Sequence, residues 1–537
     1  MRAGFRILGP LLQSAMVSLC LIAGATAEDV AGNTTSDFSF GIGERQLFLD
    51  DVGIATIENL SRTMHTPVKR GAVLRPTPPD ETSLQTRSAP AWDPEAKVFK
   101  LWLLASRTDG SSGTAYAESV DGLHWTKPAL RQKEVRGSLE NNLVTPDPAR
   151  EWPANAIENV VYDPDDPDPA RRFKGFAHCY DREPMVSPDG IHWTLLDVPK
   201  LKSSDESNLS YDARTRTFIA TLKTWGPHGR SHVITTSQDF EHWTEPVLTF
   251  HADDLDQEIG RKNIAARFAD PALQQPSHNI PETYNVDVYN VSVFRYEGLY
   301  IAMPSFYHQT GKVPKDWPGF DDPRIPPDMV KGYKESGDWS GFHEVQLMAS
   351  RDLKEWQRLG DRQPFLASSK LGSGAYDLAC VLPPSFPIVR GGELWFYYTG
   401  GMNYGLALNK GVASDAFAVC LAVLRRDGFI SLDAGETPGT VTTQPFTMPE
   451  GALWVNVDAY GGELRAEVLM DGGEVLAEST VISGDHPQAE LVWERGALNT
   501  IRGKEVRLRF TLRKGSFYAW WFGDAADVED HGAAAPD

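Results

Sequence analysis

Carboxylate side chains that could act as a pair recur at the heads of apolar segments. Three segments place an aspartate three residues before a small or amide residue: Asp205–Asn208, Asp287–Asn290 and Asp377–Cys380. A fourth offers Glu158 followed by an asparagine, at a slightly shifted position. Gathered in one concave site, one carboxyl group would stay protonated and another ionised, because repulsion and partial burial separate their pKa values. Such a pair hydrolyses glycosidic bonds. The predicted catalytic residues are Glu158, Asp205, Asp287 and Asp377.

Amide, aromatic and basic side chains accompany these acids. Amides bond sugar hydroxyls, and exposed aromatic rings stack on sugar faces. Strand alternation would turn either His343 or Glu344 toward a pocket, and an ordinary surface position is an equal alternative. Arg87 and Arg230 could bind an anionic group, although pairing with acids is favoured. The predicted substrate contacts are Arg87, Asn159, Glu206, Asn208, Trp225, Tyr289, Asn290, His343 and Glu344.

Each of these acids has a structural alternative. A strand-end aspartate is more often satisfied by local hydrogen bonds than used in catalysis. The set carries more weight than any member, because packing alone does not require several carboxylates in one place. The sequence shows no zinc-type spacing of cysteine and histidine, and no cofactor or metal ligand is assigned. A metal ion at the axis of the ring is left open.

A short repeat indicates how distant acids are brought together. The pattern S-x-D-x-x-x-W occurs four times, at Ser119–Trp125, Ser187–Trp193, Ser237–Trp243 and Ser350–Trp356. In a hairpin corner, the serine and aspartate bond nearby backbone amides and the tryptophan fills apolar space beside the next strand. We therefore assign these aspartates to turns rather than to catalysis.

Strand pairs joined by turns alternate with these boxes. The five pairs are Leu84–Ser106, Ile157–Tyr180, Asn208–Trp225, Asp287–His308 and Asp377–Gly400. They predict a five-bladed β-propeller over residues 28–427, in which the first residues of each innermost strand face the axial depression. The fifth pair lacks a complete box, so Gln46–Ile54 is expected to supply its closing strand.

The remaining segments differ in composition and in their pattern of apolar residues. Residues 251–282 are helix-permissive, and residues 307–341 are rich in proline and tryptophan, as in a lid or an oligomer contact. From residue 428, alternating strands divided by Gly-Gly turns predict a β-sandwich over residues 428–523. An acidic, alanine-rich tail over residues 524–537 is expected to be disordered. The fold class is all-β.

The N-terminus and the composition restrict localisation and partners. Arg2 and Arg6, an apolar run and Ala25-Thr-Ala27 form a signal peptide pattern over residues 1–27, with an uncleaved anchor as the alternative. A secreted or periplasmic protein is expected, with no membrane span after cleavage. The net charge of −21 disfavours nucleic acid and anionic lipid, and a neutral or weakly charged substrate fits it better.

Taken together, these residues resemble five-bladed glycoside hydrolases of the family 32 and family 43 type, which include invertases, inulinases, arabinanases and xylosidases. The resemblance rests on Leu47–Asp51, the repeated boxes and Arg426–Leu432, and it covers nearly the whole mature chain. It implies the propeller and hydrolysis by carboxylates. The W-M-N-D-P-N-G, R-D-P and E-C boxes of invertases are absent, and Arg87-Ser88-Ala89 stands where family 43 enzymes carry an aspartate. The family's catalytic trio therefore does not transfer by motif.

The sequence thus predicts a secreted glycoside hydrolase that acts on a poly- or oligosaccharide substrate. One alternative is a propeller that binds carbohydrate without catalysis, which would not need several acids in its pocket. The other is a sialidase-like hydrolase, which would need three converging arginines and a tyrosine with an acid.

Overall fold

The computed structural model describes residues 38–77, 81–107, 111–323, 327–404 and 416–524. The predicted signal peptide and residues 525–537 of the predicted tail lie outside this part. The described residues belong to one compact unit that begins at Phe38. Strands dominate it, with α1 (Asp254–Ala269) and α2 (Pro327–Ser336) as the α-helices of the described part. The predicted all-β class is confirmed.

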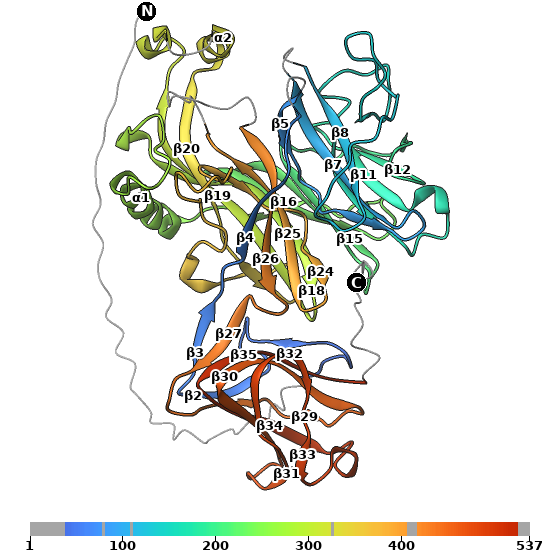
Figure 1. The fold of residues 1–537 in the computed structure, drawn as a ribbon, viewed down its shortest axis with the longest axis vertical. Coiled ribbons are helices and arrows are strands. Elements are labelled where there is room, and N and C mark those ends of the chain that lie inside the picture. The colour runs from blue at the N-terminus through green and yellow to red at the C-terminus, as the bar shows by residue number, and fades with distance from the viewer. Residues whose placement is uncertain (1–37, 78–80, 108–110, 324–326, 405–415, 525–537) are drawn as a thin grey trace, which may run out of the picture. The chain divides into compact units, whose positions relative to one another are not determined.

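Antiparallel strand groups follow one another along the chain (Figure 1). The first contains β5 (Glu81–Gln85), β6 (Ala91–Asp93), β7 (Val98–Arg107), β8 (Ser112–Ser119) and β9 (Leu143–Val144). The second contains β10 (Ile157–Tyr162), β11 (Phe173–Ala177), β12 (Glu183–Ser187) and β13 (Thr194–Leu195). The third contains β14 (Ser207–Asp212), β15 (Thr217–Gly226), β16 (Gly229–Ser237) and β17 (Val247–Phe250).

Two further groups complete this series. The fourth contains β18 (Asn285–Tyr296), β19 (Leu299–Val313), β20 (Asp338–Val345), β21 (Met348–Ser350) and β22 (Gln357–Arg358). The fifth contains β23 (Cys380–Leu382), β24 (Ile388–Arg390), β25 (Glu393–Gly401), β26 (Phe417–Arg425) and β4 (Val68–Leu74). A parallel pair between Phe417 and Ser83 joins the fifth group to the first in one ten-stranded sheet.

Hydrogen bonds from small polar side chains link each group to the next. The fifth group bonds back to the first, so the links form a closed cycle. Such bonds satisfy polar groups that are buried between neighbouring sheets. They join Ser88 to Val160, Asn159 to Ser207, Asn208 to Asn290, Ser305 to Val381 and Thr86 to Thr399.

The repeated boxes form the turns that their residues predict. Ser187 accepts a hydrogen bond from the Gly190 amide at 2.8 Å, and Asp189 accepts one from the His192 amide at 2.8 Å. The Trp193 ring donates to the Gly190 carbonyl at 3.0 Å and packs beside Trp102. The structural role expected for these residues is confirmed.

The closing strand differs from the prediction. The fifth group is completed by β4, which runs antiparallel to β26. The expected segment Gln46–Ile54 instead contributes β1 (Gln46–Leu47), which pairs with β35 (Gly515–Gly523). Leu47 and Leu49 pack in an apolar cluster with residues of the fourth and fifth groups, and Phe48 packs in the cluster of the twelve-stranded sheet, so this segment is buried on both faces. The prediction of Gln46–Ile54 as closing strand was wrong for this reason.

A twelve-stranded sheet gathers both ends of the described chain and curls into a half-barrel (Figure 1). The sequence places residues 28–427 in the propeller, but β1, β2 (Ile54–Glu58) and β3 (Ser61–Met64) pair with strands after residue 427. The other members are β27 (Ile430–Ala434), β28 (Gly439–Thr443), β29 (Phe446–Thr447), β30 (Ala452–Leu469), β31 (Val475–Ser479), β32 (Ile482–Glu490), β33 (Trp493–Arg495), β34 (Glu505–Arg513) and β35.

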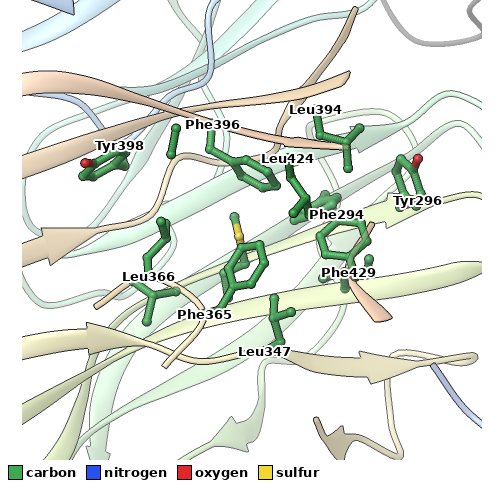
Figure 2. Packing of buried hydrophobic residues seen from close by; sticks show 14 of the residues in the cluster. Phe294, Tyr296, Leu347, Phe365, Leu366, Leu394, Phe396, Tyr398, Leu424 and Phe429 are labelled. Carbon is green, nitrogen blue, oxygen red and sulfur yellow. The ribbon is translucent and has the colours of Figure 1, made fainter. Parts of the chain in front are cut away.

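The largest buried apolar cluster lies between the fourth group, the fifth group and β27 (Figure 2). The rings of Phe365, Phe396 and Phe429 lie 5.6 to 6.3 Å apart, centroid to centroid. Large buried aromatic rings contribute strongly to core stability, so this cluster fixes the relative positions of the strands around it.

Cys179, Cys380 and Cys420 are buried and form no disulfide bond.

Both long interruptions contain helix. Within residues 251–282, α1 begins with a capping box in which Asp253 and Asp256 bond each other's backbone amides. Within residues 307–341, β19 extends to Val313 and α2 precedes β20.

Among the described residues, no helix has the length and apolar character needed to cross a membrane.

The turn boxes give a testable expectation for stability. Replacing Ser187 with alanine removes the acceptor of the buried Gly190 amide, so the free energy of unfolding should fall by about 1–3 kcal/mol. Chemical denaturation measures this change. The exposed Ser61→Ala should stay within about 0.5 kcal/mol of the wild type, and an equal loss in both variants would contradict the role of the turn.

Candidate functional site

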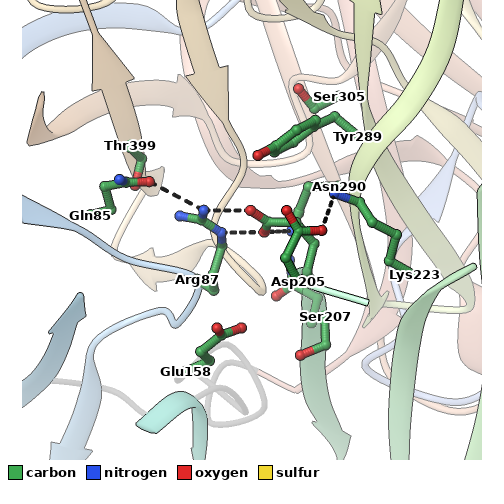
Figure 3. A network of polar contacts seen from close by, with 12 residues as sticks. Gln85, Arg87, Glu158, Asp205, Ser207, Lys223, Tyr289, Asn290, Ser305 and Thr399 are labelled. Carbon is green, nitrogen blue, oxygen red and sulfur yellow. Dashed lines mark hydrogen bonds and ion pairs between the residues drawn. The ribbon is translucent and has the colours of Figure 1, made fainter. Parts of the chain in front are cut away.

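A buried ion pair lies at the heads of the inner strands (Figure 3). Nε and Nη2 of Arg87 donate to the two carboxylate oxygens of Glu206 at 2.5 and 2.6 Å. Asn290, on β18, donates to the same carboxylate at 2.8 Å. Burial alone would lower the pKa of Arg87, but the adjacent carboxylate raises it. This pair joins the first group to the third, and Asn290 adds the fourth.

A second buried ion pair lies beside the first. Arg182 binds the Glu158 carboxylate at 2.8 Å and donates to the Ser207 hydroxyl at 2.6 Å. Burial raises the pKa of Glu158 to about 7, because Arg182 offsets the cost of a buried charge only in part. Glu158 is therefore a carboxyl group that changes protonation near neutral pH.

Asp205 is the accessible carboxylate of the site. Its side chain is 49% exposed, and Lys223 binds it at 2.8 Å. The Lys223 ammonium also lies 3.8 Å from the centre of the Tyr289 ring. Burial would raise the pKa of Asp205, but Lys223 and Arg230 hold it below its ordinary value. Asp205 is thus ionised at neutral pH.

Asp287 is a second carboxyl group of the site, and unlike Asp205 it is buried. Its Oδ2 accepts from Nη1 of Arg230 at 3.0 Å. Its Oδ1 has no hydrogen-bond partner among the described residues. Burial raises the pKa of Asp287, and Arg230 compensates only in part. A carboxyl group in this setting keeps its proton to a higher pH than an exposed one.

His343 lies within a cage of tyrosine rings. The rings of Tyr289, Tyr307 and Tyr404 lie 4.8, 5.0 and 4.5 Å from it. Both ring nitrogens lack partners within the described part of the chain. Burial, with the nearby Arg230, lowers the pKa of His343 well below its ordinary value, so the ring is neutral.

Two predicted residues point elsewhere. The Asp377 carboxylate is bound by Lys69 at 2.5 Å and by the Tyr398 hydroxyl at 3.0 Å. Glu344 follows His343 on β20 and so takes the opposite face, where Asn263 of α1 lies 3.5 Å away. Of the two side chains weighed from the sequence, His343 is therefore the one beside the site. Neither Asp377 nor Glu344 is brought to Arg87 and Glu206.

The predicted amides hold strands rather than lie open. Asn159 is buried and donates to the Ser207 carbonyl at 3.2 Å. Asn208 donates to Asn290 at 2.9 Å and accepts from Ser385 at 2.8 Å. With these partners, both amides position the inner strands. Trp225, by contrast, is 64% exposed.

Sequence reasoning missed several members of the site. Lys223 could have been found, because it lies two residues before Trp225 and strand alternation puts both on one face. Arg182 follows a strand pair with no periodic signal. Tyr307 and Tyr404 reach the site only through contacts that form when the chain folds. The same holds for His232, which is fully buried.

Two further features bear on the chemistry. A cavity of about 790 Å³ lies at the opposite ends of the inner strands, where Tyr162, Asp212, Tyr296 and Glu297 line it. None of Arg87, Glu158, Asp205 and Asp287 lines this cavity. Within the described ranges, no group of three or more His, Cys, Asp or Glu side chains is arranged to hold a metal ion.

Comparisons with known proteins find similarity in structure only. A scan against family models finds no match, and neither does a search of curated proteins. Matching solved structures include a glycoside hydrolase (12% identity, 67% of this chain and 92% of that chain, TM-score 0.40). They also include a GH32 β-fructofuranosidase of Bombyx mori (8%, 87% and 95%, 0.35) and a family 43 arabinoxylan arabinofuranohydrolase of Bacillus subtilis (10%, 82% and 78%, 0.25). Families 32 and 43, which the sequence resembles, are thus both represented among the matching solved structures. With TM-scores this low, activity has to be argued from this chain's own residues.

The Arg87–Glu206 pair should be strongly coupled. Glu206→Gln leaves a buried guanidinium without its counter-charge, so the free energy of unfolding should fall by about 3–5 kcal/mol. The double variant Arg87→Met/Glu206→Gln should recover part of that loss in a double-mutant cycle with its two single variants. The exposed pair of Arg131 and Glu140 is the control, and Glu140→Gln should cost under about 1 kcal/mol. Additive losses at Arg87 and Glu206 would contradict the coupling.

Glu158 should titrate near neutral pH. Burial raises the pKa of Glu158, Glu297 and Glu344 to about 7 each, so ¹³C-carboxyl NMR of labelled glutamate should show late-titrating signals. Glu158→Gln should remove one of them. Because the folded-state pKa lies above the ordinary 4.5, the contribution of Glu158 to stability is complete below that pH and is lost as the pH rises through about 7. A spectrum unchanged by the substitution would contradict this.

Proposed function

We propose that the strand groups are five blades of a β-propeller and that the chain is a glycoside hydrolase, secreted after loss of residues 1–27. The closed cycle of hydrogen bonds between successive groups supports the ring. The convergence of side chains from several groups on one place supports the site. The substrate is a poly- or oligosaccharide, because paired carboxyl groups beside aromatic rings suit sugar chemistry.

One observation carries this proposal: the same two cations act on two carboxyl groups whose pKa values move in opposite directions. Lys223 and Arg230 both stabilise the charge of Asp205 and of Asp287. Asp205 is accessible and its pKa is lowered, while burial raises the pKa of Asp287. Two acids separated in this way fit the two roles in glycosidic hydrolysis.

In the proposed reaction, Asp287 donates its proton to the leaving glycosidic oxygen as the bond to the anomeric carbon breaks. Asp205 supplies the second carboxylate, as base toward water or as nucleophile toward that carbon. Water provides the hydroxyl of the new reducing end and the proton that restores Asp287. Tyr289, which is half-buried beside Lys223, offers a ring face for the sugar.

Two buried ion pairs hold the strands around Asp205 and Asp287 in place. The bidentate Arg87–Glu206 contact and the Glu158–Arg182 contact fix the first, second and third groups around the site. In our proposal, Glu158 adjusts the local charge as a third acid. Arg87 and Arg182 are each paired with a buried carboxylate, and Arg230 contacts the Asp287 carboxyl group. This pairing argues against the open arginine trio of a sialidase-like hydrolase.

The proposal is tested by screening purified protein against a panel of aryl glycosides and oligosaccharides. Asp205→Asn and Asp287→Asn should each lower kcat by about 10²- to 10⁴-fold, because each removes an acid–base group. Glu436→Gln, at an exposed carboxylate paired with Lys514 in the turns of the twelve-stranded sheet, is the matched control and should retain activity. Thermal melting confirms that the variants fold. Full activity in both aspartate variants would refute the assignment.

A further inference from the structure

A largely buried cation beside the proposed site has unused hydrogen-bonding capacity. Arg230 binds Asp287 through Nη1 and its backbone amide. Its Nε and Nη2 have no hydrogen-bond partner among the described residues, and its side chain is 13% exposed. This free edge of the guanidinium presents two parallel N–H groups. That geometry matches the two oxygens of a planar carboxylate.

An aromatic ring holds Arg230 and a second cation. The Trp339 ring lies 4.7 Å from the Arg230 guanidinium and 4.8 Å from the Lys312 ammonium. Lys312 is exposed on β19. Two cations on one ring raise the local positive potential, and the ring limits the freedom of the Arg230 side chain. The edge of Arg230 is therefore preorganised for an anion.

Trp225 extends this surface outward. It is the direct cross-strand partner of Arg230 in the β15–β16 hairpin, so the two side chains share a face of the sheet. Lys223 lies on that same face, two residues earlier. The exposed Trp225 ring thus lies next to Arg230, as a flat platform on which a sugar ring can stack.

We propose that the sugar bound between Trp225 and Trp339 carries a carboxylate held by Arg230, so that the substrate is a uronic-acid-containing glycan. The inference rests on the proposed function for the identity of the ligand as a carbohydrate. It names the substrate class, and it makes Arg230 and Trp225 determinants of specificity.

The overall charge of the chain does not oppose this. A net charge of −21 would slow the approach of an acidic glycan from a distance. At physiological ionic strength, charges farther away than about 8 Å are largely screened. The nearest charges then decide binding, and at this face Arg230, Lys223 and Lys312 lie beside two carboxyl groups, Asp205 on Lys223 and Asp287 on Arg230. A neutral substrate, which the net charge favours, would leave the edge of Arg230 unused.

Binding is measured by calorimetry on Asp205→Asn protein, so that the probes are not consumed. The probes are trimers of galacturonate, of mannuronate and of guluronate, each beside its carboxyl-reduced neutral form. At least one acidic trimer should bind at least tenfold more tightly than its neutral form. Arg230→Gln should remove that preference, Trp225→Ala should weaken both forms, and Lys312→Gln should reduce the preference several-fold. Lys334→Gln, at an exposed lysine paired with Asp321, is the control.

The outcomes separate this inference from the proposed function. Preference for an acidic trimer, with no hydrolysis of any probe by the wild type, keeps the inference and refutes the hydrolase. Hydrolysis of neutral glycans, with equal binding of both forms, overturns the inference alone. Competition by inorganic phosphate at the affinity of the acidic trimer would also overturn it, because the site would then recognise a free oxyanion. Since Lys312 is exposed, its variant tests the idea even if Arg230→Gln fails to fold.

Discussion

The buried contact between Arg87 and Glu206 is the constraint on which the site depends. Neither charge is tolerable in the interior alone, and the two come from groups far apart in sequence. The contact forms only when the first and third groups reach their final positions. Asn290 then completes the hydrogen bonding of the carboxylate from the fourth group. The arrangement of the strands and the electrostatics of the site are therefore set together.

Adjacent residues divide different tasks between them. Asp205 and Glu206 are neighbours just before β14, yet Asp205 is half-exposed and Glu206 is buried. Strand alternation likewise separates His343 from Glu344 on β20. An adjacent pair in the sequence is thus not a pair in space, and the acid that complements Asp205 comes from another group, at Asp287.

The sequence predicts local features better than long-range ones. The turn boxes and strand pairs follow from turn chemistry and apolar patterning, so these features and the class could be anticipated. Candidates at Arg87, Glu158, Asp205, Glu206, Asp287 and Asn290 followed from their place at strand heads. The role of β4 could not be anticipated. Several N-terminal strands could have paired with β26, and the choice depends on which of them pair with the twelve-stranded sheet instead. Arg182 carries no periodic signal, and the positions of Asp377 and Glu344 depend on partners from distant elements.

The pairing of β4 with β26 has a kinetic consequence. One partner lies near the beginning of the described chain and the other follows the last of the inner strands. During synthesis, the earlier strand must therefore remain unpaired until almost all five strand groups have been made. Loop closure over so long a separation is slow and entropically costly. The edges of β4 stay exposed throughout this interval, so the nascent chain is most vulnerable to aggregation just before β26 is released.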